Sequence, residues 1–147
     1  MPRPFHFSLE KVLQYRQQLE DQAQLALAQA QKRYQEQTRR LESLKEQLQT
    51  QEEYFQAQTN ITANDIWLWR NYKERLLQEI QQAEEKLRQL ASEVNKRRTE
   101  AVNKAKDRKL LEKLKTNQLN KHLEQEQHKE QQEFDEMATL HHQDRHT

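Results

Sequence analysis

Glycine and cysteine are absent from this sequence of 147 residues, and its only two prolines, Pro2 and Pro4, stand at the N-terminus. Without glycine the chain lacks phosphate-binding loops and dinucleotide fingerprints, because both need a backbone that approaches the phosphate closely. Without cysteine it has no disulfide, thiolate zinc site or thiol nucleophile, which agrees with a reducing compartment. Neither of the two strongest helix interrupters occurs from residue 5 onward, so nothing there obliges a helix to stop.

Long apolar runs are missing as well. One third of the residues are charged, 33% are hydrophobic and the mean hydropathy is −1.37. No run approaches the roughly 18 apolar residues of a membrane span, and the start does not resemble a signal peptide. This composition permits either disorder or long helices that bury a narrow seam. The lack of glycine and of internal proline favours helices, and we expect a soluble, cytoplasmic protein.

Apolar and small residues recur at alternating steps of three and four, the spacing of a coiled-coil seam. We predict a first helix over about residues 8–57 and a second over about 63–140. The predicted seam consists of Leu9, Val12, Leu19, Ala23, Ala26, Ala30, Leu41, Leu44 and Leu48 in the first helix, and of Ile66, Trp69, Leu76, Ile80, Leu87, Leu90 and Val94 in the second.

Residues 57–62 form the predicted turn between these helices. Thr62 and Asp65 have the spacing of a capping box, in which each side chain bonds to the backbone N–H of the other residue. Ser8 is the predicted N-cap of the first helix. A turn this short makes the two helices antiparallel, so residue i is expected to face a residue near position 121 minus i.

The sequence therefore predicts an all-α fold, a single coiled-coil domain over 1–147 in which two helices form a long antiparallel hairpin. At 1.5 Å per residue the first helix is about 75 Å long and the second nearly 120 Å. The second helix must overhang, and 117–147 form the overhang and tail. An isolated helix of this length is marginal in water, so the overhang is either frayed when free or ordered by another molecule.

Charge is distributed unevenly along the second helix. Residues 96–121 hold ten Lys or Arg and three acids, a net charge of +7, whereas 124–136 hold six acids and one Lys, a net charge of −5. The basic stretch is either a solvated helix face or a protein-binding patch. Nucleic-acid binding is a weaker alternative, because the stretch has no aromatic residue for stacking and no recognition motif.

Both tryptophans of the chain, Trp67 and Trp69, follow the turn. Positions two apart on a helix point about 200° away from each other, so only Trp69 fits the seam. Trp67 either folds over the turn against Ile61 or joins Leu68 and Tyr72 in an exposed apolar patch. Tryptophan and tyrosine are typical anchors of protein interfaces, and the two interpretations are compatible.

Two paired helices offer no evident active site. Such a fold offers no concave pocket that excludes water from a pair of reactive groups. We therefore expect no enzymatic activity, and no catalytic residues, cofactor, metal site, small-molecule substrate or nucleic-acid partner.

Two segments near the ends of the chain carry a family resemblance. The N-terminal "FHFSLEKVLQYR" (5–16) and the "EQQEFDEMA" near the other end (130–138) resemble the opening and closing segments of the flagellar FliJ family. The aromatic cluster that includes "WRNY" (69–72) is also similar to a cluster in that family. The resemblance extends over nearly the whole chain.

This resemblance implies a non-enzymatic component of the bacterial flagellar type III export apparatus, similar in shape to the central stalk of rotary ATPases. The implied partners are the hexameric FliI-type export ATPase, which such proteins bind and promote, the FlhA-type export gate and the export chaperones. The implied location is the inner face of the cell membrane, through these partners.

The resemblance also implies roles for particular residues. The tip, with Trp67, Leu68 and Tyr72, would face the gate. The residues expected to face the ATPase are Phe5, Phe7, Arg16, Arg108, Lys109, Lys113, Lys115, Asp135 and Glu136. The alternatives are the equivalent stalk protein of an injectisome, a generic coiled-coil tether and a nucleic-acid-binding helical protein.

Overall fold

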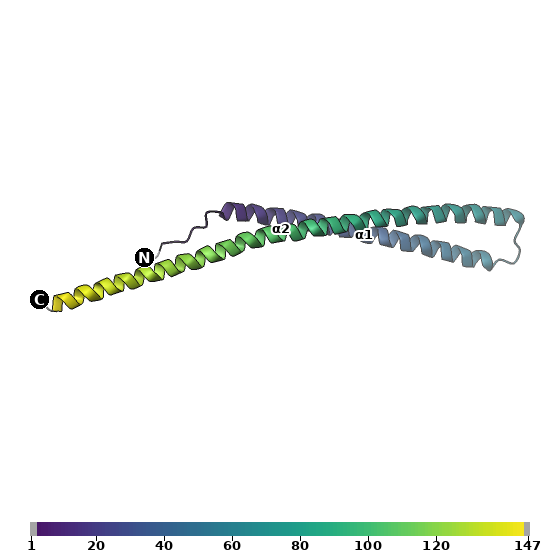
Figure 1. The fold of residues 1–147 in the computed structure, drawn as a ribbon. Coiled ribbons are helices and arrows are strands. Elements are labelled where there is room, and N and C mark those ends of the chain that lie inside the picture. Colours follow the sequence, from purple (N-terminus) through teal and green to yellow (C-terminus); the bar gives the residue numbers. More distant parts are fainter. Residues whose placement is uncertain (1–2, 146–147) are drawn as a thin grey trace. The chain divides into compact units, whose positions relative to one another are not determined.

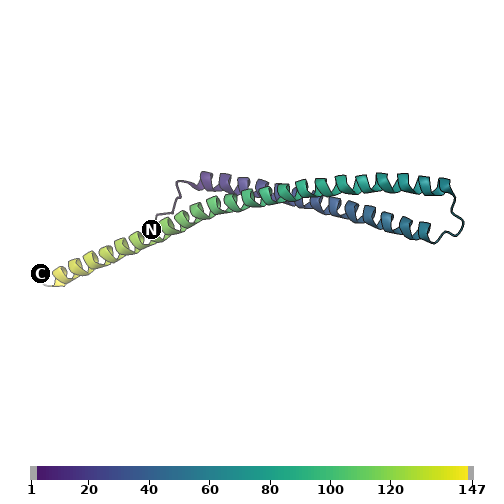
Figure 2. The same cartoon turned by 45° about the vertical axis from the view of Figure 1, so that its right-hand side comes forward.

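The fold consists of two helices, α1 (Glu10–Gln56) and α2 (Ala63–Arg145), joined by the short segment 57–62 (Figure 1). This computed structural model describes residues 3–145, and that part of the chain contains no strand. The same two helices and their connection are seen from another direction in Figure 2. The predicted all-α helical hairpin is confirmed. The end of the predicted tail, 146–147, lies outside the described residues.

The start of α2 follows from a reciprocal capping box, as predicted. The hydroxyl oxygen of Thr62 accepts a hydrogen bond from the backbone N–H of Asp65 at 3.2 Å, and the Asp65 carboxylate accepts one from the N–H of Thr62 at 3.1 Å. Each side chain thus satisfies a backbone donor that has no partner within the helix. At the start of α1, the carbonyl of Leu9 accepts the bond from the N–H of Leu13 at 2.9 Å. Leu9, not Ser8, therefore occupies the capping position.

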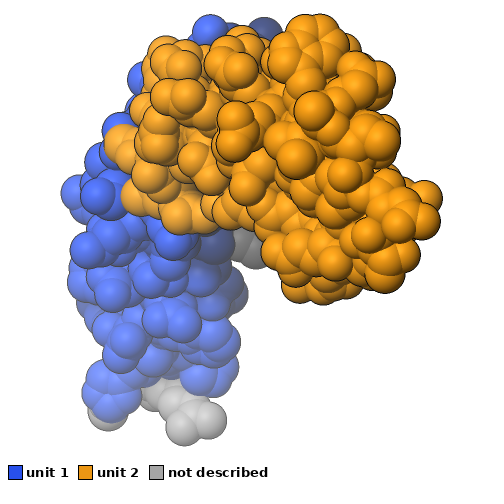
Figure 3. Space-filling view, turned by 90° about the vertical axis from the view of Figure 1, so that its right-hand side faces the viewer, with its two compact units in different colours: residues 1–20, 103–147 blue, residues 21–102 orange. Residues whose placement is uncertain are grey.

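Contacts divide the chain into two compact units (Figure 3). Unit 1 comprises residues 1–20 and 103–147, and unit 2 comprises residues 21–102. Each unit contains part of α1 and part of α2, so α1 and α2 pack against each other within both. We describe each unit by itself.

The hydrophobic core of unit 2 is the seam between the two helices. A cluster of buried residues from both helices includes Leu41, Leu44, Leu76, Ile80 and Ala83. Packed against this cluster are the half-buried Leu48, Tyr72 and Leu87. Burial of these side chains removes apolar surface from water, which is the main stabilising contribution available to so polar a chain.

Polar contacts fix the antiparallel register of unit 2. The expected pairing places Gln37 opposite position 84, and its buried side-chain amide donates to the carbonyl of Ala83 at 3.1 Å. Farther along the same interface Lys73 forms an ion pair with Glu52 at 2.6 Å. If one helix slid along the other, the Gln37 amide would stay buried without a hydrogen-bond partner. The free-energy cost of such a buried, unpaired amide exceeds what an exposed ion pair contributes to stability.

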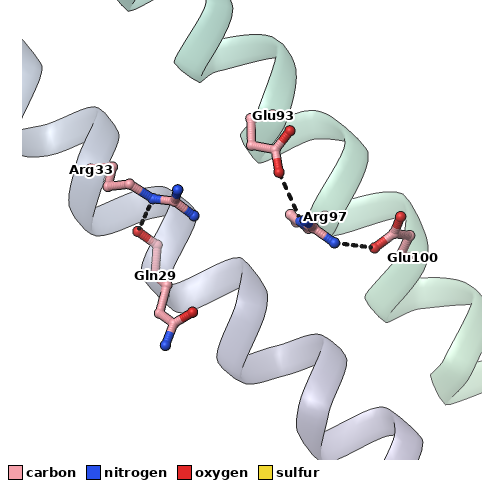
Figure 4. Close-up of polar contacts among 5 residues, drawn as sticks. All are labelled: Gln29, Arg33, Glu93, Arg97 and Glu100. Carbon is pink, nitrogen blue, oxygen red and sulfur yellow. Dashed lines mark hydrogen bonds and ion pairs between the residues drawn. The ribbon is translucent and has the colours of Figure 1, made fainter.

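Two arginines of unit 2 are held by their own helices (Figure 4). Arg97 of α2 donates to the carboxylates of Glu93 at 2.9 Å and Glu100 at 3.1 Å, one turn before it and one turn after it. The bond to Glu93, followed by that to Glu100, raises the pKa of the Arg97 guanidinium. Arg33 of α1 donates to the backbone carbonyl of Gln29 at 3.4 Å. These contacts stabilise each helix locally and do not join α1 to α2.

The seam near the start of α1, in unit 1, differs by one residue from the predicted one. Val12 is 41% exposed, whereas Leu13 is 3% exposed. Both choices keep the alternation of three and four residues, because the facing stripe passes either through Val12 and Leu19 or through Leu13 and Glu20. The second stripe lets Glu20 form an ion pair with Arg108 of α2. Leu19 is left half-buried at the edge of the seam.

The other predicted seam residues differ in burial. Ile66, in the first turn of α2, is exposed. The buried ones are Ala30, Leu41, Leu44, Leu76, Ile80 and Val94, and the half-buried ones are Leu9, Ala23, Ala26, Leu48, Trp69, Leu87 and Leu90. Neither helix, over the described residues, has a stretch long and apolar enough to cross a membrane.

Candidate functional site

The helix ends beside the turn in unit 2, here called the tip (residues 51–72), carry a stack of aromatic rings. Phe55 of α1 stacks on Trp69 of α2 with 5.4 Å between ring centroids and 14° between the planes. The Trp69 ring also contacts Tyr72 at 5.9 Å in a tilted arrangement. The hydroxyl of Tyr72 accepts a hydrogen bond from the side-chain amide of Gln47 at 2.7 Å. Trp69 and Tyr72 therefore join the two helices.

The three residues predicted to face the gate do not share one environment. Trp67 is 62% exposed and Leu68 is 52% exposed, so both present most of their surface to solvent. Tyr72 is half-buried between the helices. So large an exposed fraction is unusual for tryptophan, because burial of its ring removes a large apolar surface from water. Trp67 and Leu68 are thus the accessible part of the predicted patch.

A cavity of about 310 Å³ opens at the tip. Its apolar lining consists of Tyr54, Phe55, Ile61, Leu68 and Trp69. Gln51, Gln58, Asn60 and Asp65 supply its polar lining. The carboxylate of Asp65 accepts the backbone N–H of Thr62, and this bond, followed by the side-chain bond to Thr62, lowers the pKa of Asp65. The cavity therefore combines an apolar wall with one carboxylate that stays ionised.

In unit 1, the segment that precedes α1 lies against α2. Phe7 is buried, and the half-buried ring of Phe5 lies 5.7 Å from the ring of His122. The Nε2 atom of His122 is 2.9 Å from the backbone carbonyl oxygen of Arg3, a hydrogen bond in which the imidazole donates. The contacts of residues 3–7 with α2 thus continue the seam on the N-terminal side of α1, before its first turn.

Ion pairs connect α1 and α2 within unit 1. Arg108 donates to the carboxylate of Glu20 on α1, and also to Glu112 on its own helix at 2.7 Å. These hydrogen bonds, with that to Glu20 first, raise the pKa of the Arg108 guanidinium. Nearer the N-terminus of α1, Lys115 pairs with Glu10 at 2.8 Å. The charges of Arg108 and Lys115 are therefore already matched within unit 1.

Arg16 and the two lysines near Arg108 complete the predicted basic surface. Arg16 is half-buried and pairs with Asp107 at 3.5 Å. Lys109 and Lys113 are exposed, and neither forms an ion pair with another of the residues 3–145. They lie four positions apart, on one solvent-exposed face of α2. The structure thus divides the predicted basic patch into paired residues at the seam and two lysines that face solvent.

Asp135 and Glu136 lie on the last part of α2, where both are exposed. The contacts that residues 3–20 make with α2 reach as far as His122 in the described part of the chain. Apolar side chains exposed on the same part of α2 are Leu119, Leu123, Phe134, Met137 and Leu140. The structure therefore does not bring Asp135 and Glu136 together with the other residues predicted to face the ATPase.

The tip of unit 2 and the face of unit 1 that carries Lys109 and Lys113 both suit the binding of proteins. Within residues 3–145, no group of three or more His, Cys, Asp or Glu side chains is placed to hold a metal ion. The tip offers exposed apolar and aromatic side chains, which dominate the energy of protein interfaces. The lysine face of unit 1 offers unmatched positive charge, which steers association with an acidic surface.

A comparison with protein families identifies the chain. The model of the family described as flagellar FliJ protein matches residues 5–147, nearly the whole sequence. The protein belongs to the FliJ family. It is thus a component of the flagellar export apparatus, acting in flagellum biogenesis and protein export, and this family is a non-catalytic part of that apparatus. No curated protein and no solved structure matches the chain.

Sequence reasoning about this FliJ-family chain did not assign the aromatic residues on the α1 side of the tip to the gate-facing surface. Phe55 continues the three-four spacing of the first helix, so its position in the seam was a usable signal. Tyr54 lies outside the seam and is exposed, and only its closeness to the turn links it to Trp67 and Leu68. The cavity itself depends on side-chain packing around the turn, which spacing does not describe.

Proposed function

We propose that this FliJ-family protein binds the hexameric FliI-type export ATPase through unit 1 and the FlhA-type export gate through the tip of unit 2. In this role it promotes the ATPase, couples it to the gate and assists the handling of export chaperones. It acts in the cytoplasm at the inner face of the cell membrane, where its partners hold it. The observation that carries the proposal is the presence of two chemically distinct exposed surfaces on one FliJ-family chain.

Contact with the ATPase is assigned to unit 1 because it holds charge that the hairpin itself does not neutralise. Lys109 and Lys113 project from α2, and Asp135 and Glu136 are exposed farther along the same helix. A basic stretch followed by an acidic one suits a partner with a patterned surface. Phe5, Phe7, Arg16, Arg108 and Lys115 support this surface by holding the N-terminal segment and α1 against α2.

Contact with the gate is assigned to the tip because Trp67 and Leu68 are exposed there. Removing such side chains from water contributes about 25 cal/mol per Å² of apolar surface. Tryptophan is also among the side chains that are enriched at the energetic centres of interfaces. Tyr72 acts from within the tip by fixing the ring of Trp69.

Pull-down with the export ATPase, together with its rate of ATP hydrolysis, tests the first contact. The double reversal Lys109→Glu, Lys113→Glu is expected to weaken ATPase binding and stimulation by about tenfold, since each exposed charge contributes up to about 1 kcal/mol. The matched control is Lys32→Glu, Lys86→Glu, which reverses two exposed charges of unit 2. Unchanged stimulation by the first variant, with helicity intact, would contradict the assignment.

Binding of the cytosolic part of the gate tests the second contact. Trp67→Ala is expected to reduce gate binding by at least tenfold while changing thermal stability little, because Trp67 is mostly exposed. Leu77→Ala, which truncates another exposed apolar residue of α2, is the control. A variant that loses stability but keeps its affinity for the gate would show that Trp67 has a structural role instead.

A further inference from the structure

We propose that the cavity at the tip receives an apolar side chain from a partner segment that carries Lys or Arg beside it. This inference specifies the chemistry of the tip contact, and it rests on the proposed function for the identity of the partner as the export gate. The occupant to which we commit is a basic amphipathic segment. Three observations support this choice: the aromatic wall, the charge of the lining and the direction in which nearby cations lie.

The wall of the cavity is suited to a single large apolar anchor. Phe55 and Trp69, the half-buried residues of the lining, form its floor; their rings are stacked, and the Trp69 ring also contacts Tyr72. Ile61 and Leu68 lie on the turn side and are partly exposed. A volume of about 310 Å³ is at the small end of the range for ligand sites, which fits one side chain of a peptide and not a whole cofactor.

The charge of the lining selects the neighbours of that anchor. Asp65 is the one charged residue among those that line the cavity, and its bonds with Thr62 hold the carboxylate in the ionised form. A partner carboxylate beside the anchor would be repelled, whereas a lysine or arginine would be attracted. The exposed aromatic ring of Tyr54, which also lines the cavity, adds a second attraction for a cation through its ring quadrupole.

Positive charge of the tip itself does not cancel this preference. Arg70 follows Asp65 by five positions on α2, which turns it about 140° around the helix from the carboxylate. Lys73 is bound to Glu52 at 2.6 Å. An anionic lipid surface would meet the Asp65 carboxylate at the mouth of the cavity, so the same charge that favours a basic peptide disfavours a membrane.

Tryptophan fluorescence of the full chain tests this inference with defined probes. The Trp67→Phe variant leaves Trp69, in the floor of the cavity, as the single reporter. The probes are three 14-residue peptides, a helical one of Leu and Lys, its Leu/Glu counterpart, and a Ser/Lys peptide without apolar residues. We expect the Leu/Lys peptide to shift the Trp69 emission and to bind about tenfold more tightly than either of the others.

Two pairs of substitutions locate the binding. Asp65→Asn, which keeps an oxygen that accepts the Thr62 N–H, is expected to weaken the Leu/Lys peptide about fivefold, and Glu133→Gln in the acidic segment of unit 1 is expected to leave it unchanged. Leu68→Ala is expected to weaken it about tenfold, whereas Leu77→Ala has no effect. Equal effects of Asp65→Asn and Glu133→Gln would show general attraction to an acidic protein and would overturn the inference.

The remaining outcomes separate this inference from the proposed function. Equal affinity for the Leu/Lys and Leu/Glu peptides, or quenching of Trp69 by self-association or by anionic vesicles in place of the peptide, would overturn the inference. If the gate binds the tip while the peptides show no preference, the proposed gate contact stands and the inference falls. If the Leu/Lys peptide binds as expected while the gate does not, the chemistry of the cavity stands and the gate is the wrong partner.

Discussion

Leu76 and Leu77 are neighbours on α2 with opposite environments, 4% and 45% exposed respectively. Leu76 belongs to the buried cluster of unit 2, so truncating it removes apolar contacts and leaves a cavity. We expect Leu76→Ala to lower the free energy of unfolding by about 2–5 kcal/mol. Urea denaturation followed by circular dichroism measures this, and Leu77→Ala, expected within about 0.5 kcal/mol of wild type, is the control. Equal losses in both variants would contradict the assigned core.

Asp65 links the start of α2 to pH. Its pKa is lowered in the folded protein from the ordinary 3.8, first by the backbone N–H of Thr62 and then by the Thr62 side chain. A lowered carboxyl pKa stabilises the fold when the group is ionised, so this contribution is present above pH 3.8 and is lost as the pH falls through the folded pKa. The capping bond to Thr62 should therefore weaken only at pH values below 3.8.

Amide exchange of Thr62 and of the first turn of α2 checks this expectation. Acidification below pH 3.8 is expected to open these amides in the wild type beyond the change seen in Asp65→Asn, whose side chain does not titrate. Many other carboxylates titrate in the same range, so the comparison between the two proteins carries the test. Greater protection of Thr62 in the wild type at low pH than at neutral pH would contradict the assigned direction.

At the scale of the helix, the contacts of α2 change along its length. Residues near Ile80 pack against α1 in unit 2, and His122 contacts residues near the N-terminus in unit 1. Beyond that point the apolar side chains of Phe134 and Met137 are exposed. A helix without tertiary packing is marginal in water, because its stability in proteins comes mainly from burial of one face.

Hydrogen exchange measures this difference between segments of one helix. Backbone amides of residues 124–140 are expected to exchange faster than those of 76–94, where opening requires loss of the buried seam. Addition of the export ATPase is expected to slow exchange in 124–140, because Asp135 and Glu136 belong to the proposed contact. Equal protection of both segments in the free protein would contradict the view that packing against α1 is what stabilises α2.

The helices and the turn are the parts of the fold that the sequence predicts well. The absence of internal glycine and proline, together with the seam spacing, predicted both helices and the turn. The Thr62–Asp65 spacing predicted the capping box because that motif is local and needs only four residues. The relation derived from the turn position, residue i facing a residue near 121 minus i, places Gln37 opposite position 84, one residue from Ala83, whose carbonyl it contacts.

What the sequence could not predict depends on choices between equally spaced residues. Val12 and Leu13 both continue the three-four alternation, and the ion pair between Glu20 and Arg108 accompanies the stripe that buries Leu13. Within the basic stretch, Arg108 is paired across the seam while the adjacent Lys109 faces solvent. Composition treats these two cations alike, and only the rotation of α2 about its axis separates them.

For the molecule as a whole, the proposed function rests on the presence of two different surfaces on one chain. Unit 1 supplies unmatched charge, and the tip of unit 2 supplies an aromatic cavity and exposed apolar side chains. The surface of a generic coiled coil is charged throughout. The exposed apolar side chains of Trp67 and Leu68 are therefore the features that most strongly indicate a binding partner. Loss of either surface should therefore uncouple one partner and leave the other bound.

Site-specific photo-crosslinking tests this two-partner account most directly. A photoreactive residue is placed at Lys113 in one protein and at Trp67 in another, each mixed with both the export ATPase and the cytosolic part of the gate. The account predicts that position 113 crosslinks to the ATPase and position 67 to the gate. Crosslinking of both positions to the same partner, or the reverse assignment, would contradict it.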